Sequence, residues 1–245
     1  MEKDTIIYGL RPVIEAIDSG KEVDKVLIQN GLRSELFGEL RALLAQHGIP
    51  YQFVPEEKLR RVTTKNHQGV IAYISNISYS DIEHIIPFVF EQGKTPFVLV
   101  LDRITDVRNF GAIARSASCA GCDAIVIPYY NSVRISADAI KSSAGALYKV
   151  PVCRSKSLVQ TLEFLKSSGL QIVACTEKAG EPYYNLDYSI PTAIIMGSEE
   201  DGISEILLKV SDEKAKIPMA GDIASLNVSV ACGIIMFEAL KQRSR

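Results

Sequence analysis

Three short segments of this sequence hold the kinds of side chain that bind polar ligands. The first contains Asn109 and Arg115, and the second is the acidic run 199–201. The third contains Ser225 and Asn227. Each segment taken alone also fits a structural role, as a helix cap, a surface arginine or a solvated acidic turn before a helix. Their chemical meaning therefore depends on whether the fold brings them together.

A further candidate is a cluster of cationic side chains near residue 60, at the end of a predicted helix over 56–61. Its members are Lys58, Arg60, Arg61, Lys65 and His67. Such a cluster is typical of a phosphate-binding patch. A solvated helix face explains it equally well.

The cysteines and glycines argue against two other kinds of site. Cys119 and Cys122 have the spacing of two zinc ligands, but no second pair lies nearby, so we expect core packing and no metal. Five cysteines without framework spacing predict reduced thiols in a cytoplasm. No Gly-x-Gly-x-x-Gly follows a predicted strand, so an ordinary dinucleotide-binding loop has no support.

The composition is that of a soluble globular protein. The 245 residues are 47% hydrophobic and 23% charged, with a net charge of −2. These values exclude wholesale disorder, and any nucleic-acid surface must be a local patch on a neutral body. No apolar run approaches the roughly 18 residues that span a bilayer, and the N-terminus lacks a secretory signal. We therefore expect a cytoplasmic protein without membrane contact.

Hydrophobic periodicity divides the chain into three parts. Residues 1–75 alternate short strands and helices and predict a compact α/β domain, in which Ser34 caps a helix over 35–46. Residues 76–95 contain Pro87 and an excess of acid, and we interpret them as a linker with one helical turn. Residues 96–245 predict a second, larger domain.

The larger domain alternates apolar strands with amphipathic helices. The strands are expected at 97–101, 124–127, 170–175, 193–196 and 214–217, and the helices at 110–120, 137–144, 158–167 and 228–241. This alternation predicts a mostly parallel sheet covered on both faces. Ligands bind such sheets in the loops beyond the carboxyl ends of the strands. The three segments described first all fall in such loops.

In combination and in this order, the three segments resemble the signatures of the SpoU (TrmH-type) family of RNA ribose 2′-O-methyltransferases, within the SPOUT class. They read Asn-x-Gly-x-x-x-Arg from Asn109, Met-Gly-Ser-Glu-x-x-Gly-Ile from Met196, and Ile-Pro-Met followed by Ser-Leu-Asn-Val-Ser from Ile217. Glu200 stands where many members have glycine. Tyr8-Gly9 and residues 66–70 also resemble the small RNA-binding domain of the ribosomal RNA members.

The resemblance implies a fold and partners. Residues 1–75 would form a small α/β (L30e-like) RNA-binding domain, and residues 96–245 a parallel-sheet α/β domain with a deep trefoil knot, a rare exception to the rule against threaded loops. The family acts as a homodimer on structured RNA. The small domain favours a guanosine of 23S rRNA as the target.

The resemblance also implies site residues. S-adenosylmethionine would lie against Met196, Gly197, Ile217, Leu226 and Thr176. Arg115 would activate the ribose 2′-hydroxyl, and Asn109, Glu199, Ser225 and Asn227 would orient it. Arg60, Arg61, Lys65 and His67 would bind RNA.

The role of Arg115 has two versions. A guanidinium is a poor general base because it stays protonated in proteins. Arg115 would therefore either lose its proton beside the sulfonium or, as we favour, remain a cation that stabilises the developing alkoxide and grips phosphate. Glu199 is its expected charge partner.

Three other functions remain as alternatives. A transfer RNA methyltransferase belongs to the same class of enzyme, and a catalytically silent RNA-binding protein could use the same scaffold. A metabolic enzyme that binds a nucleotide on a doubly wound sheet is the third, and the sequence lacks its glycine fingerprint.

Overall fold

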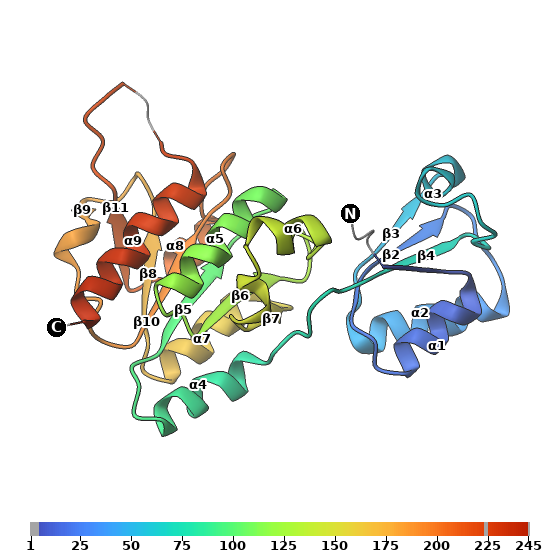
Figure 1. Ribbon diagram of the computed structural model, residues 1–245, viewed down its shortest axis with the longest axis horizontal. Helices are drawn as coiled ribbons and strands as arrows, with labels where there is room; N and C mark the ends of the chain where they lie inside the picture. The colour runs from blue at the N-terminus through green and yellow to red at the C-terminus, as the bar shows by residue number, and fades with distance from the viewer. Residues whose placement is uncertain (1–4, 223–224, 245) are drawn as a thin grey trace. The chain divides into compact units, whose positions relative to one another are not determined.

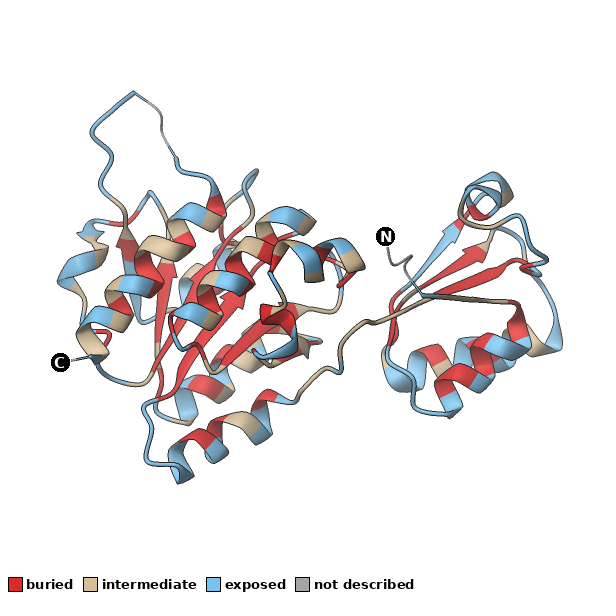
Figure 2. Ribbon diagram, viewed as in Figure 1, coloured by how far each residue is buried: buried red, intermediate tan, exposed pale blue. Residues whose placement is uncertain are grey.

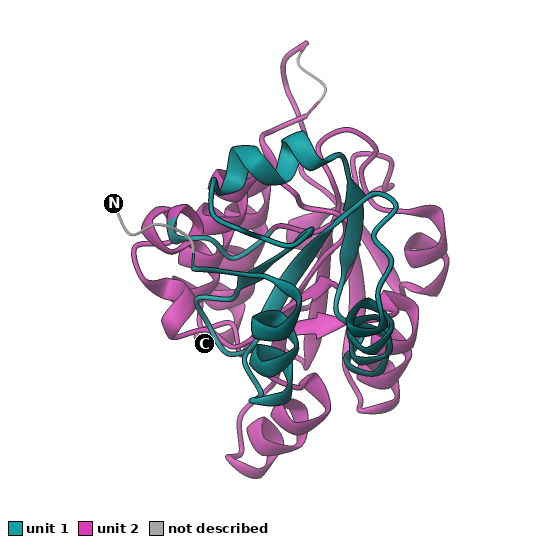
Figure 3. Cartoon of the chain, turned by 90° about the vertical axis from the view of Figure 1, so that its right-hand side faces the viewer, with its two compact units in different colours: residues 1–78, 134–137 teal, residues 79–133, 138–245 magenta. Residues whose placement is uncertain are grey.

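The structure is a computed structural model that describes residues 5–222 and 225–244. The chain divides into two compact units (Figure 3). Unit 1 comprises Met1–Ser78 with Arg134–Ala137, and unit 2 comprises Tyr79–Val133 with Asp138–Arg245. Each unit has its own hydrophobic core.

Unit 1 is a four-stranded sheet with helices on it, in the strand order β1-β4-β2-β3 (Figure 1). Its elements are β1 (Ile6–Tyr8), α1 (Leu10–Asp18), β2 (Val23–Gln29), α2 (Glu35–His47), β3 (Tyr51–Val54), α3 (Glu56–Val62) and β4 (Val70–Ile74). Helices α1 and α2 pack on one face of the sheet. Leu59 of α3 packs on the other face.

Helix α2 forms where its end signals predict it. The Ser34 hydroxyl accepts a hydrogen bond from the Phe37 N–H at 3.1 Å, and Gly48 ends the helix in the left-handed conformation. Leu40 and Leu44 lie one turn apart and are both buried, so one face of the helix enters the core.

Unit 2 is built on a seven-stranded sheet, in the order β7-β6-β5-β10-β8-β11-β9, and all its strand pairs are parallel. Its strands are β5 (Phe97–Leu101), β6 (Ala124–Pro128), β7 (Val152–Ser155), β8 (Gln171–Cys175), β9 (Glu181–Pro182), β10 (Thr192–Met196) and β11 (Glu213–Lys216). Its helices are α4 (Ile82–Glu91), α5 (Val107–Cys119), α6 (Ala137–Ser142), α7 (Leu158–Ser167), α8 (Glu205–Val210) and α9 (Val228–Arg243), with short 3-10 turns at Ala146–Tyr148 and Tyr183–Asn185.

Helices cover both faces of this sheet (Figure 1). Helices α4, α7 and α8 pack against one face, which presents Val98 and Val100 of β5. Alternate residues of a strand point to opposite faces, so Leu99 and Leu101 enter the layer beneath α5 and α9. Figure 2 shows the central strands buried throughout. The prediction of a parallel sheet covered on both faces is confirmed.

The interpretation of residues 76–95 as a linker is corrected in part, because they contain the ten-residue helix α4. The Asp81 carboxylate caps it by accepting a hydrogen bond from the Glu83 N–H at 2.9 Å. Ile82 and Ile86 are buried in the core of unit 2, and this burial outweighs the helix-breaking tendency of Pro87. The trefoil knot stays a prediction.

Candidate active site

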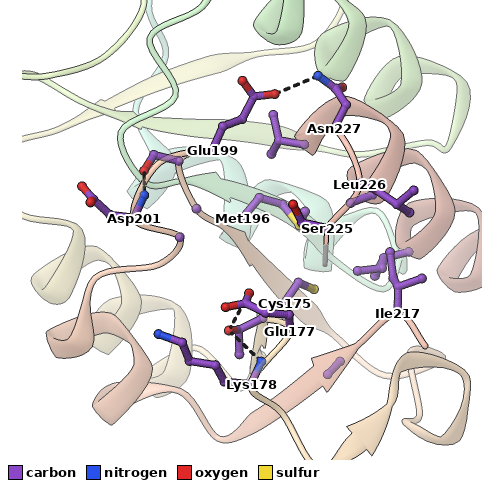
Figure 4. Close-up of a pocket in the computed structure, with 18 of the residues that line it drawn as sticks. Cys175, Glu177, Lys178, Met196, Glu199, Asp201, Ile217, Ser225, Leu226 and Asn227 are labelled. Carbon is purple, nitrogen blue, oxygen red and sulfur yellow. Dashed lines mark hydrogen bonds between the residues drawn. The ribbon is translucent and has the colours of Figure 1, made fainter. Parts of the chain in front are cut away.

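A cavity of about 510 Å³ opens in unit 2 at the carboxyl ends of β8, β10 and β11 (Figure 4). Ligands bind parallel sheets at this edge because the loops of neighbouring strands meet there. The residues expected at the cofactor all line the cavity, and so does Ser225. These residues are Thr176, Met196, Gly197, Ile217 and Leu226.

The three segments singled out in the sequence meet beside this cavity. The Asn109 Nδ2 donates a hydrogen bond to Glu199 Oε1 at 2.9 Å. The Asn227 Nδ2 donates to the same Glu199 oxygen at 2.8 Å (Figure 4). The same Nδ2 also donates to Asn109 Oδ1 at 3.0 Å. We call these three residues the amide–carboxylate trio. Two amides therefore fix the position of one carboxylate.

Helix capping explains why both amides are available. The side chain of Asn109 could itself cap α5, but the cap is Asp106, whose Oδ1 accepts a hydrogen bond from the Asn109 N–H at 2.8 Å. The Asn109 side chain lies in the first turn, free to contact Glu199. Asn227 does cap α9, and its Oδ1 accepts a hydrogen bond from the Ser229 N–H at 3.0 Å. Its Nδ2 is left for the other two members of the trio.

Glycines shape the loop that carries Glu199. A Cβ at Gly197 would overlap the backbone of Gly202 and of Ile203. Gly202 has φ of +68°, in the left-handed region. The N–H of each of Ser198 and Gly202 donates to the carbonyl of the other, at 3.1 and 3.0 Å, which closes the loop. Glu200 has no positive φ, so the loop does not need glycine at that position.

Arg103, two residues beyond the end of β5, holds the same loop. Its Nη1 donates to Asp201 Oδ2 at 3.0 Å and its Nη2 to the Gly202 carbonyl at 3.1 Å. Its Nε donates to Asp102 Oδ1 at 3.2 Å, and Asp102 is only 4% exposed. The other Asp102 oxygen accepts a hydrogen bond from the Ser204 N–H at 2.7 Å. We call this set of contacts the Arg103 clamp.

The sequence interpretation missed the Arg103 clamp. Arg103 has φ of +60°, in the left-handed region that glycine adopts freely and that is strained for a long side chain such as arginine. The hydrogen bond to Asp102 raises the pKa of Arg103 above its ordinary value, so the guanidinium stays charged. An Asp-Arg pair directly after a strand, together with an acidic loop after another strand, was the signal available in the sequence.

The cavity is acidic. Glu177, Glu199, Glu200 and Asp201 line it, and Lys178 is the one basic residue among the described residues that do so. Such a lining favours a ligand that carries positive charge.

Arg115 does not join the trio within one chain. Its side chain is exposed on α5, and it is not among the described residues that line the cavity. The expected charge pair with Glu199 is replaced by the two amide contacts. Helix α5 packs against α9, and the role of Arg115 therefore depends on what covers these two helices.

Three of the four predicted RNA-binding residues line a separate cavity in unit 1, of about 380 Å³. These are Arg60, Lys65 and His67; Arg61 is exposed and is not among the described residues of that cavity. Arg60 pairs with Glu56 at 2.7 Å. His67 is buried, which the sequence did not indicate.

Two further observations concern metal sites and membrane-spanning helices. Among residues 5–222 and 225–244, no group of three or more His, Cys, Asp or Glu side chains could hold a metal ion. Within the same ranges, no helix is long and apolar enough to cross a membrane. Cys119 ends α5 and is exposed, whereas Cys122 lies beyond the helix and is buried, which raises its pKa to about 12.

The family models match this chain along most of its length. The SpoU rRNA methylase family matches residues 96–237, and RNA 2′-O ribose methyltransferase substrate binding matches residues 6–80. YacO of Bacillus subtilis strain 168, named for the TrmH family of tRNA/rRNA methyltransferases, is 33% identical over 238 residues, which are 97% of this chain and 96% of YacO.

Solved structures agree. The SpoU methyltransferase AviRb from Streptomyces viridochromogenes, in complex with AdoMet, has a TM-score of 0.62 over 99% of this chain and 91% of AviRb, and at 24% identity it shows a shared fold. An AdoMet-bound rRNA methyltransferase from Sinorhizobium meliloti has a TM-score of 0.61 and 26% identity over 98% of this chain and 87% of its own. From the extent of these matches and from the three signature loops that meet at one cavity, the chain belongs to the SpoU rRNA methylase family of RNA methyltransferases.

Proposed function

We propose that this chain transfers a methyl group from S-adenosylmethionine to a ribose 2′-hydroxyl of structured RNA, and that the target is a guanosine of 23S rRNA. The observation that carries the proposal is the amide–carboxylate trio at the edge of the acidic cavity. The segment matched over residues 6–80 supports RNA as the substrate. The AdoMet-bound relative from S. meliloti supports the cofactor.

The residues of the cavity fit this cofactor. When bound, S-adenosylmethionine supplies an electrophilic methyl group on a positively charged sulfur. The volume of about 510 Å³ lies within the range of about 300–1,000 Å³ typical of small-molecule sites. Ile217 and Leu226 offer apolar walls, while the acidic residues favour a cation.

In this proposal Glu199 acts on the ribose hydroxyl. Both amides of the trio donate to its Oε1. No other described residue forms a hydrogen bond with its Oε2, which therefore can accept the hydrogen of the 2′-hydroxyl. Because two amides hold the carboxylate, little reorientation is needed when the hydroxyl oxygen attacks. Ser225 lines the same cavity and supplies a hydroxyl for positioning.

Arg115 acts from a second copy of the chain in this proposal. Helix α9 leaves Val230 and Phe237 exposed, at 51% and 47%, although its opposite side is buried in unit 2. An apolar outer face on a long helix is typical of a subunit interface. A homodimer built on α5 and α9 would cover this face and bring the partner's guanidinium towards the 2′-oxygen, where it stabilises negative charge.

Labelled cofactor tests the reaction. The protein is incubated with labelled S-adenosylmethionine and unmodified 23S rRNA, 16S rRNA or transfer RNA, and methylated riboses are mapped. We expect transfer to a single guanosine of 23S rRNA. Methylation of transfer RNA alone would show that the target is transfer RNA and not 23S rRNA. Cofactor binding in calorimetry without transfer to any RNA would leave only an RNA-binding role.

Mixed dimers test the placement of Arg115. Arg115→Ala and Asn227→Ala chains are co-expressed with different tags, and mixed dimers are purified. If Arg115 acts across the interface, one of the two sites in a mixed dimer is intact, and activity is about half that of wild type. If it acts within its own chain, both sites are defective and activity is lost. Gel filtration that shows only a monomer would contradict the dimer.

A further inference from the structure

The cavity in unit 1 lies between α3 and the segment that joins α3 to β4. The described residues that line it are all polar or glycine, and its charged members are Arg60, Lys65 and Glu56. Polar surroundings of this kind can hold water alone. Assigning a ligand to the cavity therefore needs a further observation.

His67 supplies that observation. The residue lines the cavity but is only 8% exposed. Its Nδ1 accepts a hydrogen bond from the Gly69 N–H at 3.0 Å. A neutral imidazole that accepts at one nitrogen carries its hydrogen on the other, so Nε2 is a donor. Among the described residues Nε2 has no acceptor, and it is not one of the fully enclosed atoms. A buried side chain thus offers an unpaired N–H beside the cavity.

The backbone around His67 is fixed before any ligand arrives. Gln68 and Gly69 both have positive φ, of +48° and +79°. Gln68 Oε1 accepts a hydrogen bond from the Leu10 N–H at 3.3 Å, and the Gly69 carbonyl accepts one from the Gln29 N–H at 2.7 Å. The donor is therefore preorganised, which reduces the entropy lost on binding.

The charged groups of the cavity favour an anionic ligand rich in oxygen acceptors. Arg60 shares its charge with Glu56, so Lys65 provides the net positive charge of the cavity. Its Nζ lies 5.6 Å from the centre of the Tyr8 ring. Phosphate is such an anion, and the Asn66 amide can pair with either donors or acceptors of a base. Proteins read RNA sequence mainly from unstacked bases in loops and bulges.

We propose that this cavity binds one unstacked nucleotide of the substrate RNA. Lys65 and Arg60 contact its phosphate, and the Nε2–H of His67 donates to an acceptor atom of its base. The inference rests on the proposed function for RNA as the ligand, and it specifies which feature of the RNA unit 1 recognises. In this proposal Arg61, one of the four predicted RNA-binding residues, does not contact the nucleotide.

Labelled RNA hairpins that share one stem test the inference. One hairpin is fully paired, and each of the others carries a single bulged nucleotide, which is A, C, G or U. Binding to the full chain is followed by fluorescence anisotropy. We expect tighter binding of at least one bulged hairpin. His67→Asn keeps an acceptor for the Gly69 N–H but lacks the Nε2 donor. It should weaken binding of the preferred bulged hairpin about tenfold, the effect of one lost hydrogen bond, and leave the paired hairpin unaffected.

Two matched variants separate this donor from fold and charge. His67→Gln places an amide N–H near the position of Nε2 and should retain part of the preference. Arg41→Ala removes one cation from α2, which packs on the face of the sheet opposite Leu59 of α3, and should leave the preference unchanged. Lys65→Ala should weaken bulged binding and reduce its salt dependence.

Equal binding of all hairpins by the wild type, or an unchanged preference in His67→Asn, would overturn the inference. Cofactor binding and methyl transfer are measured separately. Loss of the bulge preference with methylation intact rejects only the cavity assignment. A bulge preference without any methylation rejects only the proposed reaction.

Discussion

Arg103 offers a prediction whose size can be worked from the structure, because two opposing effects meet at one residue. Its side chain donates hydrogen bonds to Asp102, Asp201 and the Gly202 carbonyl. Its backbone, with φ of +60°, is in a conformation that favours glycine. Arg103→Gly removes the clamp and the strain together, and Arg103→Ala removes the clamp alone.

The clamp should outweigh the strain. A hydrogen bond to a charged group contributes about 1.5–3 kcal/mol, but exposed pairs such as that with Asp201 contribute at most about 1 kcal/mol. The buried Asp102 keeps the Ser204 N–H as a partner, so we expect a total loss of about 2–3 kcal/mol. Relief of the left-handed conformation returns about 1 kcal/mol in the glycine variant. Arg103→Gly should therefore lose about 1–2 kcal/mol, and Arg103→Ala about 2–3 kcal/mol.

Thermal unfolding measures the difference. At about 2–4 °C per kcal/mol for a chain of this size, the midpoint should fall by about 2–8 °C in Arg103→Gly and by about 4–12 °C in Arg103→Ala. Calorimetry should show weaker cofactor binding in both variants, because the loop that carries Glu199 is no longer held. A glycine variant more stable than wild type would show that the clamp contributes less than the strain. Equal midpoints for the two variants would show that the strain is absent.

Three further predictions concern single groups. Glu199→Gln retains an acceptor for the two amides but loses the carboxylate charge, so kcat for methyl transfer should fall about 100-fold or more. The calorimetric Kd for the cofactor should rise only slightly, because three other carboxylates still line the cavity; an unchanged kcat would exclude proton acceptance by Glu199. Iodoacetamide at pH 8 should modify Cys119 in the folded protein, because burial raises the pKa of Cys122 and of Cys153 to about 12; peptide mass spectrometry that finds Cys122 equally modified would contradict this. Desolvation raises the pKa of Asp123 in the folded state, so near this pKa the folded chain binds more protons than the unfolded chain. The free energy of unfolding of the wild type should therefore fall, relative to that of Asp123→Asn, as the pH rises from below the ordinary aspartate pKa towards neutrality. Parallel plots of urea-derived stability against pH for the two proteins would refute this.

The sequence predicted those elements whose signals are local. The boundaries of α7 were predicted as the structure has them, because Ser157 caps the helix and its buried leucines recur with helical spacing. Helix α4 was missed because Pro87 and the acidic residues indicate a linker, whereas burial of Ile82 and Ile86 depends on contacts with strands far along the chain. Strand β3 was missed because three of its four residues are exposed, so it lacks the alternation of a half-buried strand.

The residues of the candidate site also differ in how far the sequence could predict them. Residues of the three loops could be identified because each follows a strand of a parallel sheet, and such strand ends meet at one edge. The Arg103 clamp was missed, since the Asp-Arg pair after β5 and the acidic loop after β10 suggest a contact but do not reveal the positive φ of Arg103 or its pairing with Asp201. The spacing from Asn109 to Arg115 defines an angle around α5 and a distance along it. It does not determine which copy of the chain Arg115 serves.

The charges at the cavity link the proposed cofactor, substrate and dimer. Four carboxylates against one lysine repel the phosphates of an approaching RNA. The single positive charge of Arg103 is shared between Asp102 and Asp201, so it neutralises at most one of them, and the two amides hold Glu199 without neutralising it. The remaining negative charge must be balanced by positive groups brought to the site, and the two in this proposal are the cofactor's sulfonium and the partner's Arg115. Each binding step would then prepare the next, because the acidic lining that attracts the cofactor becomes compatible with RNA only after the cation is in place.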